Sequence, residues 1–205
     1  MGRSAPGTGL RQRHDLLVTA TRLAAQRSLG SASSDIAHAA STGRVLPAPG
    51  GGQKTGPKPT DRGKCGSKRH IIVDRRGLPL ALSMTGDNRH DSMAFETLVD
   101  AIPAIPGLPG RPKQKPYKLH VDKGYDYRRC REHLSRRGVL VRIARRGVES
   151  SEKLGRHRWV VERTYSWLAG FGKLRIRFER RLDMHYALLK LAFSLICLRF
   201  IDRFC

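Results

Sequence analysis

The amino-acid sequence predicts an α/β protein with a mixed sheet and helices on both faces. Short apolar runs of strand length alternate with longer helical stretches between residues 69 and 204. Their order is strand, strand, helix, strand, helix, strand, helix, helix, and such alternation favours a sheet with crossover helices. At 205 residues the chain is long enough for one domain with a buried core and additional tails.

The first two predicted strands form a hairpin. They cover Arg69–Asp74 and Leu78–Gly86, which are apolar and are separated by a short turn containing glycine. A polar segment then precedes a helix over Met93–Ala101, for which Asp91 or Ser92 is the expected N-cap.

The second half of the chain continues the alternation of strands and helices. Gly138 is placed to end one helix as a C-cap. The last helix contains four charged residues within its apolar stretch, so we expect no membrane span. The predicted elements are a strand over Tyr117–Val121, a helix over Tyr125–Arg137, a strand over Val139–Ala144, and helices over Arg156–Phe171 and Met184–Phe204.

Residues 1–50 differ in composition from everything after them. They contain no Lys, Glu, Cys or aromatic residue and are rich in Ala, Gly, Ser and Arg. Apart from one amphipathic stretch over residues 16–29, this segment is a poor core-former. We therefore expect residues 1–50 to be an atypical segment, disordered or produced by a frameshift, joined to the folded domain over residues 51–205.

The composition points towards a polyanionic partner. Lys and Arg number 40 against 17 Asp and Glu, which gives a formal charge of +23. Nucleic acid is the first candidate because neutralising phosphates releases counterions, although a ribosomal or merely basic protein has the same composition. The four cysteines form no Cys-x-x-Cys pair, and the N-terminus has no apolar signal-peptide core. We expect a cytoplasmic protein with reduced thiols.

A basic loop occupies residues 50–67, where Gly and Pro disfavour regular structure. Its cations suit contacts with DNA phosphates, and a solvated linker explains the same composition equally well. The candidate DNA contacts are Lys54, Lys58, Arg62, Lys64 and Lys68 in and beside this loop, with Lys123, Arg163 and Lys173 further along.

Two carboxylates are the candidate centre of the chemistry. Asp122 follows a buried strand, and taken alone it is more simply explained as a turn residue. Glu162 lies on a predicted helix, where Arg158 and Ser166 share its face and where a surface Glu–Arg pair is the plain alternative. Together, two acids from separate elements fit a divalent-metal site of the kind that acts on phosphodiesters.

Five blocks of sequence, in order, resemble the C-terminal part of DDE transposases of bacterial insertion sequences. The group is the insertion-sequence-five type, within the insertion-sequence-four-like class, and the resemblance covers about residues 51–201. The blocks are Gly-Gly-Gln-Lys-Thr-Gly-Pro-Lys-Pro-Thr-Asp-Arg-Gly-Lys, Gly-Ser-Lys-Arg-His-Ile-Ile-Val-Asp-Arg, Thr-Gly-Asp-Asn-Arg-His-Asp-Ser, Val-Asp-Lys-Gly-Tyr-Asp and Arg-Trp-Val-Val-Glu-Arg-Thr-Tyr-Ser-Trp-Leu.

This resemblance implies a ribonuclease-H-like fold and strand cleavage and transfer that depend on Mg²⁺ or Mn²⁺. The DNA partners it implies are double-stranded terminal inverted repeats and target DNA, and it leaves a homodimer open. It makes Asp122 the second catalytic Asp, Glu162 the catalytic Glu, and Arg158 the Arg of the family's Arg…Glu signature. Seven residues after the Glu the family often has a Lys or Arg; here that position is Ala169, with Lys173 one helical turn on as the candidate substitute.

The resemblance fails at the first catalytic Asp, which in the family ends the first strand. No acid lies between Gly43 and Gly52, and Asp35 is the nearest upstream acid, in a context that does not match. We therefore expect the first strand to be missing or degenerate and the protein to be a truncated or defective transposase. The alternative is a catalytically inactive DNA-binding remnant that interferes with an intact transposase. An RNA-binding structural protein is disfavoured because the basic loops lack aromatic stacking residues.

Overall fold

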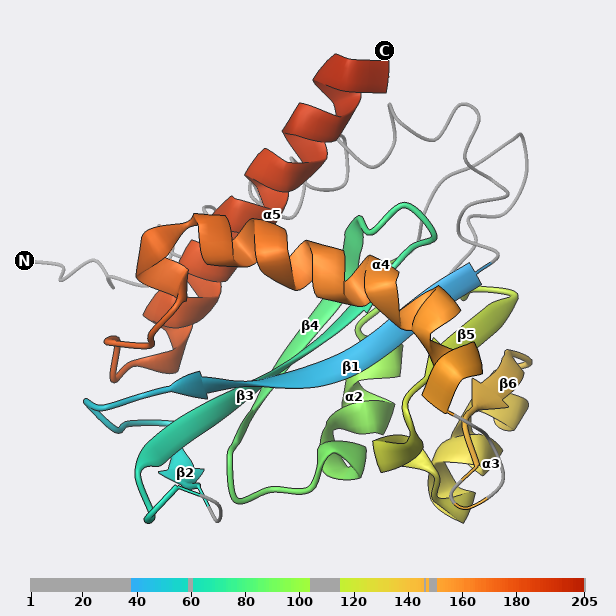
Figure 1. Cartoon of the computed structure of the whole chain (residues 1–205), viewed down its shortest axis with the longest axis horizontal. Coiled ribbons are helices and arrows are strands. Elements are labelled where there is room, and N and C mark those ends of the chain that lie inside the picture. The colour runs from blue at the N-terminus through green and yellow to red at the C-terminus, as the bar shows by residue number, and fades with distance from the viewer. Residues whose placement is uncertain (1–37, 59–60, 104–114, 146, 148–150, 205) are drawn as a thin grey trace, which may run out of the picture.

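The computed structural model describes residues 38–58, 61–103, 115–145, 147 and 151–204, and the side chains among these except those of residues 38–40, 151–158, 203 and 204. A six-stranded mixed sheet lies between two pairs of helices (Figure 1). The predicted fold class, a mixed sheet with flanking helices, is confirmed.

The sheet has the order β2-β3-β1-β5-β6, with β4 also paired to β3. Strand β1 is antiparallel to β3 and parallel to β5, and β5 is parallel to β6. The sheet therefore changes from antiparallel to parallel at β1. The strands are β1 (His38–Pro47), β2 (Gly56–Pro57), β3 (Cys65–Val73), β4 (Pro79–Gly86), β5 (Lys118–Val121) and β6 (Leu140–Ile143).

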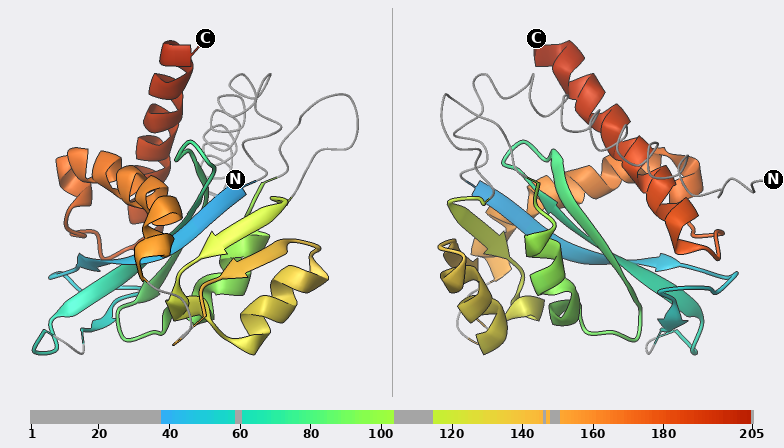
Figure 2. Two further views of the ribbon diagram at one scale, coloured as in Figure 1. Left: turned by 45° about the vertical axis from the view of Figure 1, so that its right-hand side comes forward. Right: turned by 180° about the vertical axis from the view of Figure 1, so that it is seen from behind.

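Helices cover both faces of this sheet. One face carries the two long helices and the other carries the two short ones, as the two views of Figure 2 show. The α-helices are α2 (Phe95–Asp100), α3 (Arg128–Arg136), α4 (Ser151–Gly170) and α5 (Leu182–Phe204), and the 3₁₀ helices are η1 (Asp91–Ala94), η2 (Lys123–Tyr125) and η3 (Gly172–Leu174).

Strand β3 shows which side chains face which helices. Ile71 packs in a core cluster with residues of α4 and α5, whereas Ile72 packs in a second cluster with residues of α2 and α3. Side chains alternate along a strand, and directly paired residues of adjacent strands point to the same face. Because Thr42 pairs with Ile71, it faces α4. Gly43 pairs with His70 and faces the opposite side.

The first strand corrects two expectations. We expected it to be missing or degenerate. It is not missing, because β1 lies at the centre of the sheet and pairs on both sides. Residues 38–50 thus belong to the folded domain, and the boundary expected at residue 50 lies inside that domain. Sequence patterns missed β1 because it contains small and polar residues without clear apolar alternation. Residues 1–37, including the helix expected over residues 16–29, lie outside the described residues.

The basic loop is also more regular than expected. Strand β2 pairs with the start of β3, which begins at Cys65. The buried guanidinium of Arg177 donates to Ser67 Oγ at 2.8 Å and to the carbonyl oxygen of Lys54 at 3.4 Å. Gly52 has a φ of +110°, and a Cβ added there would lie 2.3 Å from the carbonyl oxygen of Arg180. The loop is therefore held against the segment that precedes α5.

The first helical turn after β4 has a different cap from the one expected. Neither Asp91 nor Ser92 caps it; the N-cap is His90, whose Nδ1 accepts a hydrogen bond from the backbone N–H of Ser92 at 3.3 Å. Asp91 instead forms an ion pair with Lys68 at 3.2 Å. A nearby cation, which the local sequence pattern does not contain, therefore decides the role of Asp91.

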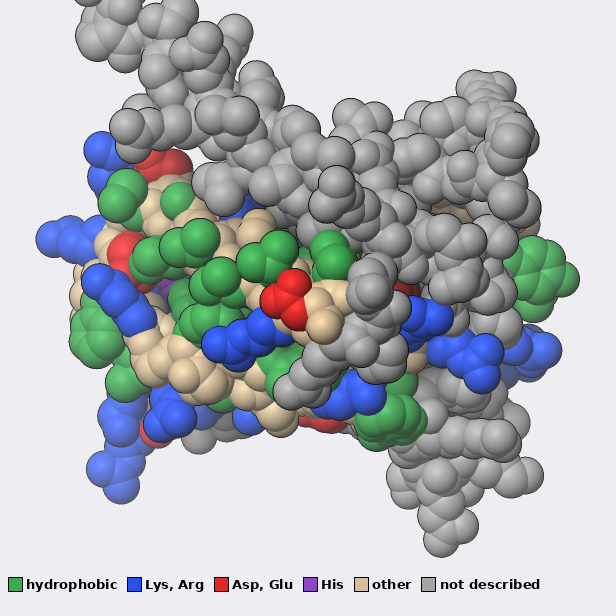
Figure 3. All heavy atoms as spheres, turned by 90° about the horizontal axis from the view of Figure 1, so that it is seen from above, with side chains coloured by type: hydrophobic (Ala, Val, Ile, Leu, Met, Phe, Trp, Pro, Cys, Tyr) green, Lys and Arg blue, Asp and Glu red, His purple; other side chains and the backbone are tan. Residues whose placement is uncertain are grey.

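Helix α5 is longer than expected. Its Leu182–Asp202 stretch has a mean hydropathy of 1.5 and, despite its charged residues, is long and apolar enough by length and composition alone to cross a membrane, a test that the core helix of a soluble protein also passes. Its buried side, which includes Leu189, Phe193 and Ile196, packs into the core with α4. Figure 3 shows hydrophobic side chains gathered over the α4–α5 face. The apolar composition of α5 is explained in part by this core packing.

A buried histidine leads to a prediction of acid sensitivity. His70 is fully buried, and its ring nitrogens lie 3.0 Å from Tyr125 Oη and 2.9 Å from Thr85 Oγ1. Burial lowers the pKa of His70 to about 4, against the opposing pull of Asp91. The unfolded chain therefore takes up a proton at higher pH than the folded chain, and the free energy of unfolding falls as the pH drops from about 6.5 to about 4.

We expect this loss to reach about 3 kcal/mol, measured by urea denaturation at a series of pH values. The His70→Gln variant should be less stable at neutral pH but should show a flatter pH dependence over the same window. Equal slopes for the two proteins would contradict the assignment.

Candidate active site

Asp122 lies at the carboxyl end of β5. Its Oδ1 accepts a hydrogen bond from the N–H of Lys123 at 2.7 Å, so it caps η2 as the turn interpretation predicts. The preceding residue, Val121, pairs with Ser41 of β1 and packs in the α2–α3 core. Asp122 therefore points to the α4 face and lies beside Thr42 when the register is continued by one residue. The turn role and the site role are compatible.

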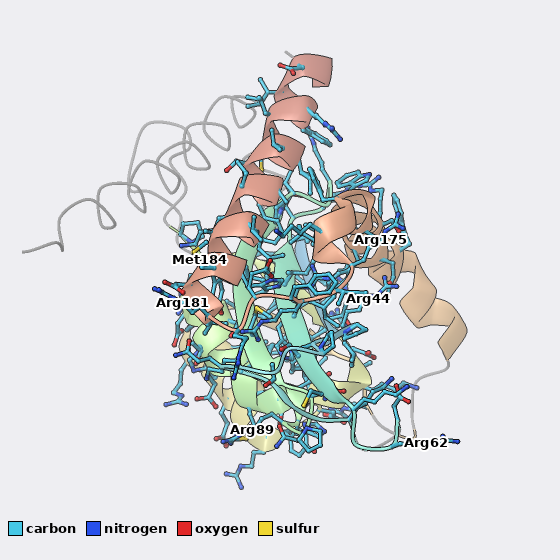
Figure 4. The ribbon with its side chains drawn as sticks, turned by 90° about the vertical axis from the view of Figure 1, so that its left-hand side faces the viewer. Arg44, Arg62, Arg89, Arg175, Arg181 and Met184 are labelled. Atoms are coloured by element: carbon cyan, nitrogen blue, oxygen red, sulfur yellow. The ribbon has the colours of Figure 1, made fainter. Side chains whose placement is uncertain are left out.

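Glu162 approaches strand β1 from the face of the sheet that α4 covers. It lies on the exposed side of α4, and its Oε2 is 3.7 Å from Nη1 of Arg44, a β1 residue. Figure 4 shows Arg44 beside α4. Thr42 and Arg44 are about 7 Å apart along β1. The predicted acids thus lie on one face of the sheet, beside the same short segment of β1.

Tyr165 fixes α4 over this segment. Its buried Oη lies 2.6 Å from the carbonyl oxygen of Arg69 and 3.2 Å from that of Thr42, so one hydroxyl hydrogen serves both carbonyls. Burial raises the pKa of Tyr165 well above its ordinary value, which keeps this hydroxyl protonated. Arg44 also lies over the Tyr165 ring, at 5.7 Å from its centroid. The position of Glu162 therefore depends on a buried contact one helical turn away.

No third acid from the described part of the chain joins the pair. Among the described residues, no group of three or more His, Cys, Asp or Glu side chains is placed to hold a metal ion. The polar β1 side chains on this face, beside the two acids, are the neutral Thr42 and the cationic Arg44. Asp35, the candidate for the first Asp, lies outside the described residues. A divalent cation prefers anionic oxygen ligands, so the side chains in place do not form a complete site for Mg²⁺ or Mn²⁺.

The two predicted arginines of α4 have different outcomes. The backbone of Arg158 belongs to α4, one turn before Glu162, and its side chain lies outside the described part of the structure. The guanidinium of Arg163 lies between two indole rings, 4.5 Å from the centroid of Trp159 and 5.0 Å from that of Trp167. It also donates to the carbonyl oxygen of Arg76. Arg163 therefore attaches α4 to the β3–β4 turn.

The predicted basic contacts fall into two groups. Lys54, Arg62 and Lys64 are exposed around β2, and Figure 4 shows Arg62 well apart from Arg44. Lys64 also lies 3.7 Å from Asp61. The other lysines have neighbours too: Lys58 is 3.4 Å from Asp61, Lys68 is 3.2 Å from Asp91 and 3.8 Å from Asp87, the exposed Lys173 is 3.9 Å from Glu179, and Lys123 is half-buried in the turn after Asp122. Several of the predicted DNA contacts thus already have an acidic neighbour within the protein, so the net charge exceeds the number of cations without one.

Comparisons with known proteins give one consistent family. A family model described as a transposase DDE domain matches residues 40–197, which run from β1 into α5. A protein named "Putative transposase for insertion sequence element IS402" from Burkholderia cepacia is 46% identical over 200 residues, covering 92% of this chain and 95% of that protein. This second match extends into residues 1–50, the segment that we expected to be atypical.

More distant matches have related names. The transposase for insertion sequence element IS1106 from Neisseria meningitidis serogroup B is 24% identical over 133 residues, covering 63% of this chain and 42% of that protein. The crystal structure of the Mos1 mariner paired end complex with Mn has a TM-score of 0.41 at 10% identity, covering 100% of this chain and 64% of that chain. This chain thus spans less than two thirds of either protein.

The Tyr165 contact gives a prediction about stability. Tyr165→Phe removes a buried hydroxyl shared by two carbonyls, so we expect the free energy of unfolding to fall by about 1–2 kcal/mol in chemical denaturation. Tyr117, which is 69% exposed, provides the matched control. Tyr117→Phe should change stability by less than about 0.5 kcal/mol. Equal effects of the two substitutions would show that Tyr165 does not fasten α4.

Proposed function

We propose that this chain acts in DNA transposition at the terminal inverted repeats of an insertion sequence. The basis is that the chain belongs to the family of transposase DDE domains. The observation that carries this proposal is the placement of Asp122 and Glu162 on one face of a ribonuclease-H-like sheet, beside the same segment of β1. The five sequence blocks support the finer assignment to the insertion-sequence-five type within the insertion-sequence-four-like class.

Binding of double-stranded DNA is the part of this function that the chain supports most strongly. A formal charge of +23 favours a polyanion, and Lys54, Arg62 and Lys64 form an exposed cationic surface around β2. Terminal repeats and target DNA are the proposed partners, in the bacterial cytoplasm and on the nucleoid. A homodimer is a further prediction, which light scattering on the purified protein can measure.

Strand cleavage and transfer by this chain are proposed to be weak or absent. In this family a divalent ion such as Mg²⁺ or Mn²⁺ is expected to activate the attacking oxygen and to stabilise the leaving oxygen of a phosphodiester. Asp122 and Glu162 are the proposed ligands, but Arg44 lies against Glu162 and no third acid joins them among the described residues. The same observation favours the second candidate function, an inactive DNA-binding remnant that interferes with an intact transposase.

The first test concerns the basic surface around β2. The double variant Lys54→Gln/Arg62→Gln removes two exposed charges. Both residues have positive φ angles. Glutamine has a side chain, as lysine and arginine do, so it leaves the backbone strain at these positions unchanged, whereas glycine would relieve it. We expect weaker binding of terminal-repeat DNA, and a slope of log K against log salt that is less negative by about 1–2. The measurement is fluorescence anisotropy at several salt concentrations.

The matched control for this test is Arg128→Gln. Arg128 lies on α3, across the sheet from α4, and is paired with Glu132 at 2.6 Å. It should leave the salt slope unchanged. If both variants make the salt slope less negative by the same amount, DNA does not bind preferentially at the β2 surface.

The second test concerns the chemistry. Incubation of the wild-type protein with terminal-repeat DNA and Mg²⁺ or Mn²⁺ should give little or no nicked or joined product on a denaturing gel. Robust metal-dependent product that disappears in Asp122→Ala would refute the proposal of a defective site. Binding without product in every metal would favour the interfering remnant.

A further inference from the structure

We infer that Thr42 occupies the position of the missing carboxylate. Together, Thr42 and Arg44 convert a metal site into a site that binds DNA phosphate without a metal. This inference rests on the proposed function, because it concerns the same face of the sheet. It adds the position of the defect, its electrostatic cause and the substitutions that would reverse it.

The strand register identifies Thr42. On one side Thr42 pairs with Ile71, which packs against α4, so Thr42 faces α4. On the other side Ser41 pairs with Val121, the last residue of β5. Continuing this register by one residue places Thr42 opposite Asp122. Neighbouring strands are about 5 Å apart, and side chains from this pair are close enough to share one cation. Thr42 is buried under α4, the helix that carries Glu162.

The positions next to Thr42 cannot take this role. Ser41 pairs with Ile72 and faces the α2–α3 core. Gly43 faces the same side, and a Cβ added there would lie 2.9 Å from His70 Nδ1 and 3.1 Å from Asp91 Oδ2. Asp91 itself approaches β1 from this opposite side and pairs with Lys68. Among the described residues of this segment, Thr42 alone faces α4 beside Asp122.

Arg44 adds a second obstacle to metal binding. Mg²⁺ can be held by only one or two carboxylates together with phosphate oxygens, so the absence of one acid is not sufficient to prevent binding. The guanidinium of Arg44, however, lies 3.7 Å from the Glu162 carboxylate and neutralises it in part. A dication would then meet a Glu162 carboxylate that already has a positive charge beside it.

The same guanidinium suits a phosphate. Arginine binds phosphate oxygens through its planar fork of N–H groups and keeps its charge at any physiological pH. The Arg44 side chain is 56% exposed, so the DNA backbone can reach it. We therefore assign Arg44 a phosphate contact that needs no metal, at the place where the family's chemistry requires one.

The test is a reconstruction of the site. The double variant Thr42→Asp/Arg44→Ser supplies the carboxylate and removes the competing cation, and Thr42→Asn/Arg44→Ser has the same shape without the charge. Titration with Mn²⁺, followed by electron paramagnetic resonance without DNA, should show one site in the Asp variant that binds at least tenfold more tightly than any site in the wild type or the Asn variant. Adding Asp122→Asn to the Asp variant should abolish it.

DNA binding gives the second readout. Anisotropy with terminal-repeat DNA should be the same within twofold in EDTA and in Mn²⁺ for the wild-type protein, and Mn²⁺ should strengthen binding several-fold for the Asp variant. Arg44→Ser alone should weaken wild-type binding in EDTA. An unchanged affinity would overturn the phosphate contact.

Two results would overturn the metal assignment. One is a wild-type Mn²⁺ site that is lost in Asp122→Asn or Glu162→Gln, and this wild-type titration decides the question even if the Asp variant fails to fold. The other is a folded Asp variant, by circular dichroism, without the new site. Because the Mn²⁺ titrations contain no DNA, failure of the wild-type protein to bind terminal repeats would count against the proposed function and the Arg44 phosphate contact, whereas the metal assignment is decided by the titrations.

Discussion

The pairing of β1 between β3 and β5 is the constraint on which the rest of the structure depends. It joins the antiparallel part of the sheet to the parallel part, and it places Thr42 beside Asp122 and Arg44 beneath Glu162. Backbone hydrogen bonds hold a strand in place whatever its side chains are. A segment of small and polar residues can therefore complete the sheet while lacking the acid that chemistry would need.

The fold and the chemistry are thus separable in this protein. Helix α4 is held over β1 by the buried hydroxyl of Tyr165 and by the stack of Arg163 between two indole rings. None of these contacts involves Asp122 or Glu162. The scaffold that brings the two acids to one face is therefore retained independently of whether a metal can bind there.

Charge must be examined residue by residue in the same way. The formal excess of 23 positive charges is large, but several cations have partners within the protein. Lys68 is paired with two acids, Arg177 is buried and hydrogen-bonded to the β2 loop, and Arg163 is stacked on indole rings. The contacts of these cations stabilise the fold. The cations that remain exposed around β2 and at Arg44 lie in two separate places, which implies an extended footprint on DNA.

The sequence by itself determined the mixed sheet, the flanking helices after residue 69, and the strand-end and helical positions of Asp122 and Glu162, because these follow from local patterns of apolar residues and turns. The family resemblance also came from contiguous blocks. Only the tertiary structure decided that residues 38–47 form the central strand, that His90 caps η1, that Arg177 orders the basic loop, and that Thr42 faces α4. Each of these depends on strand register or on a partner far away in the chain, and no local pattern contains that information.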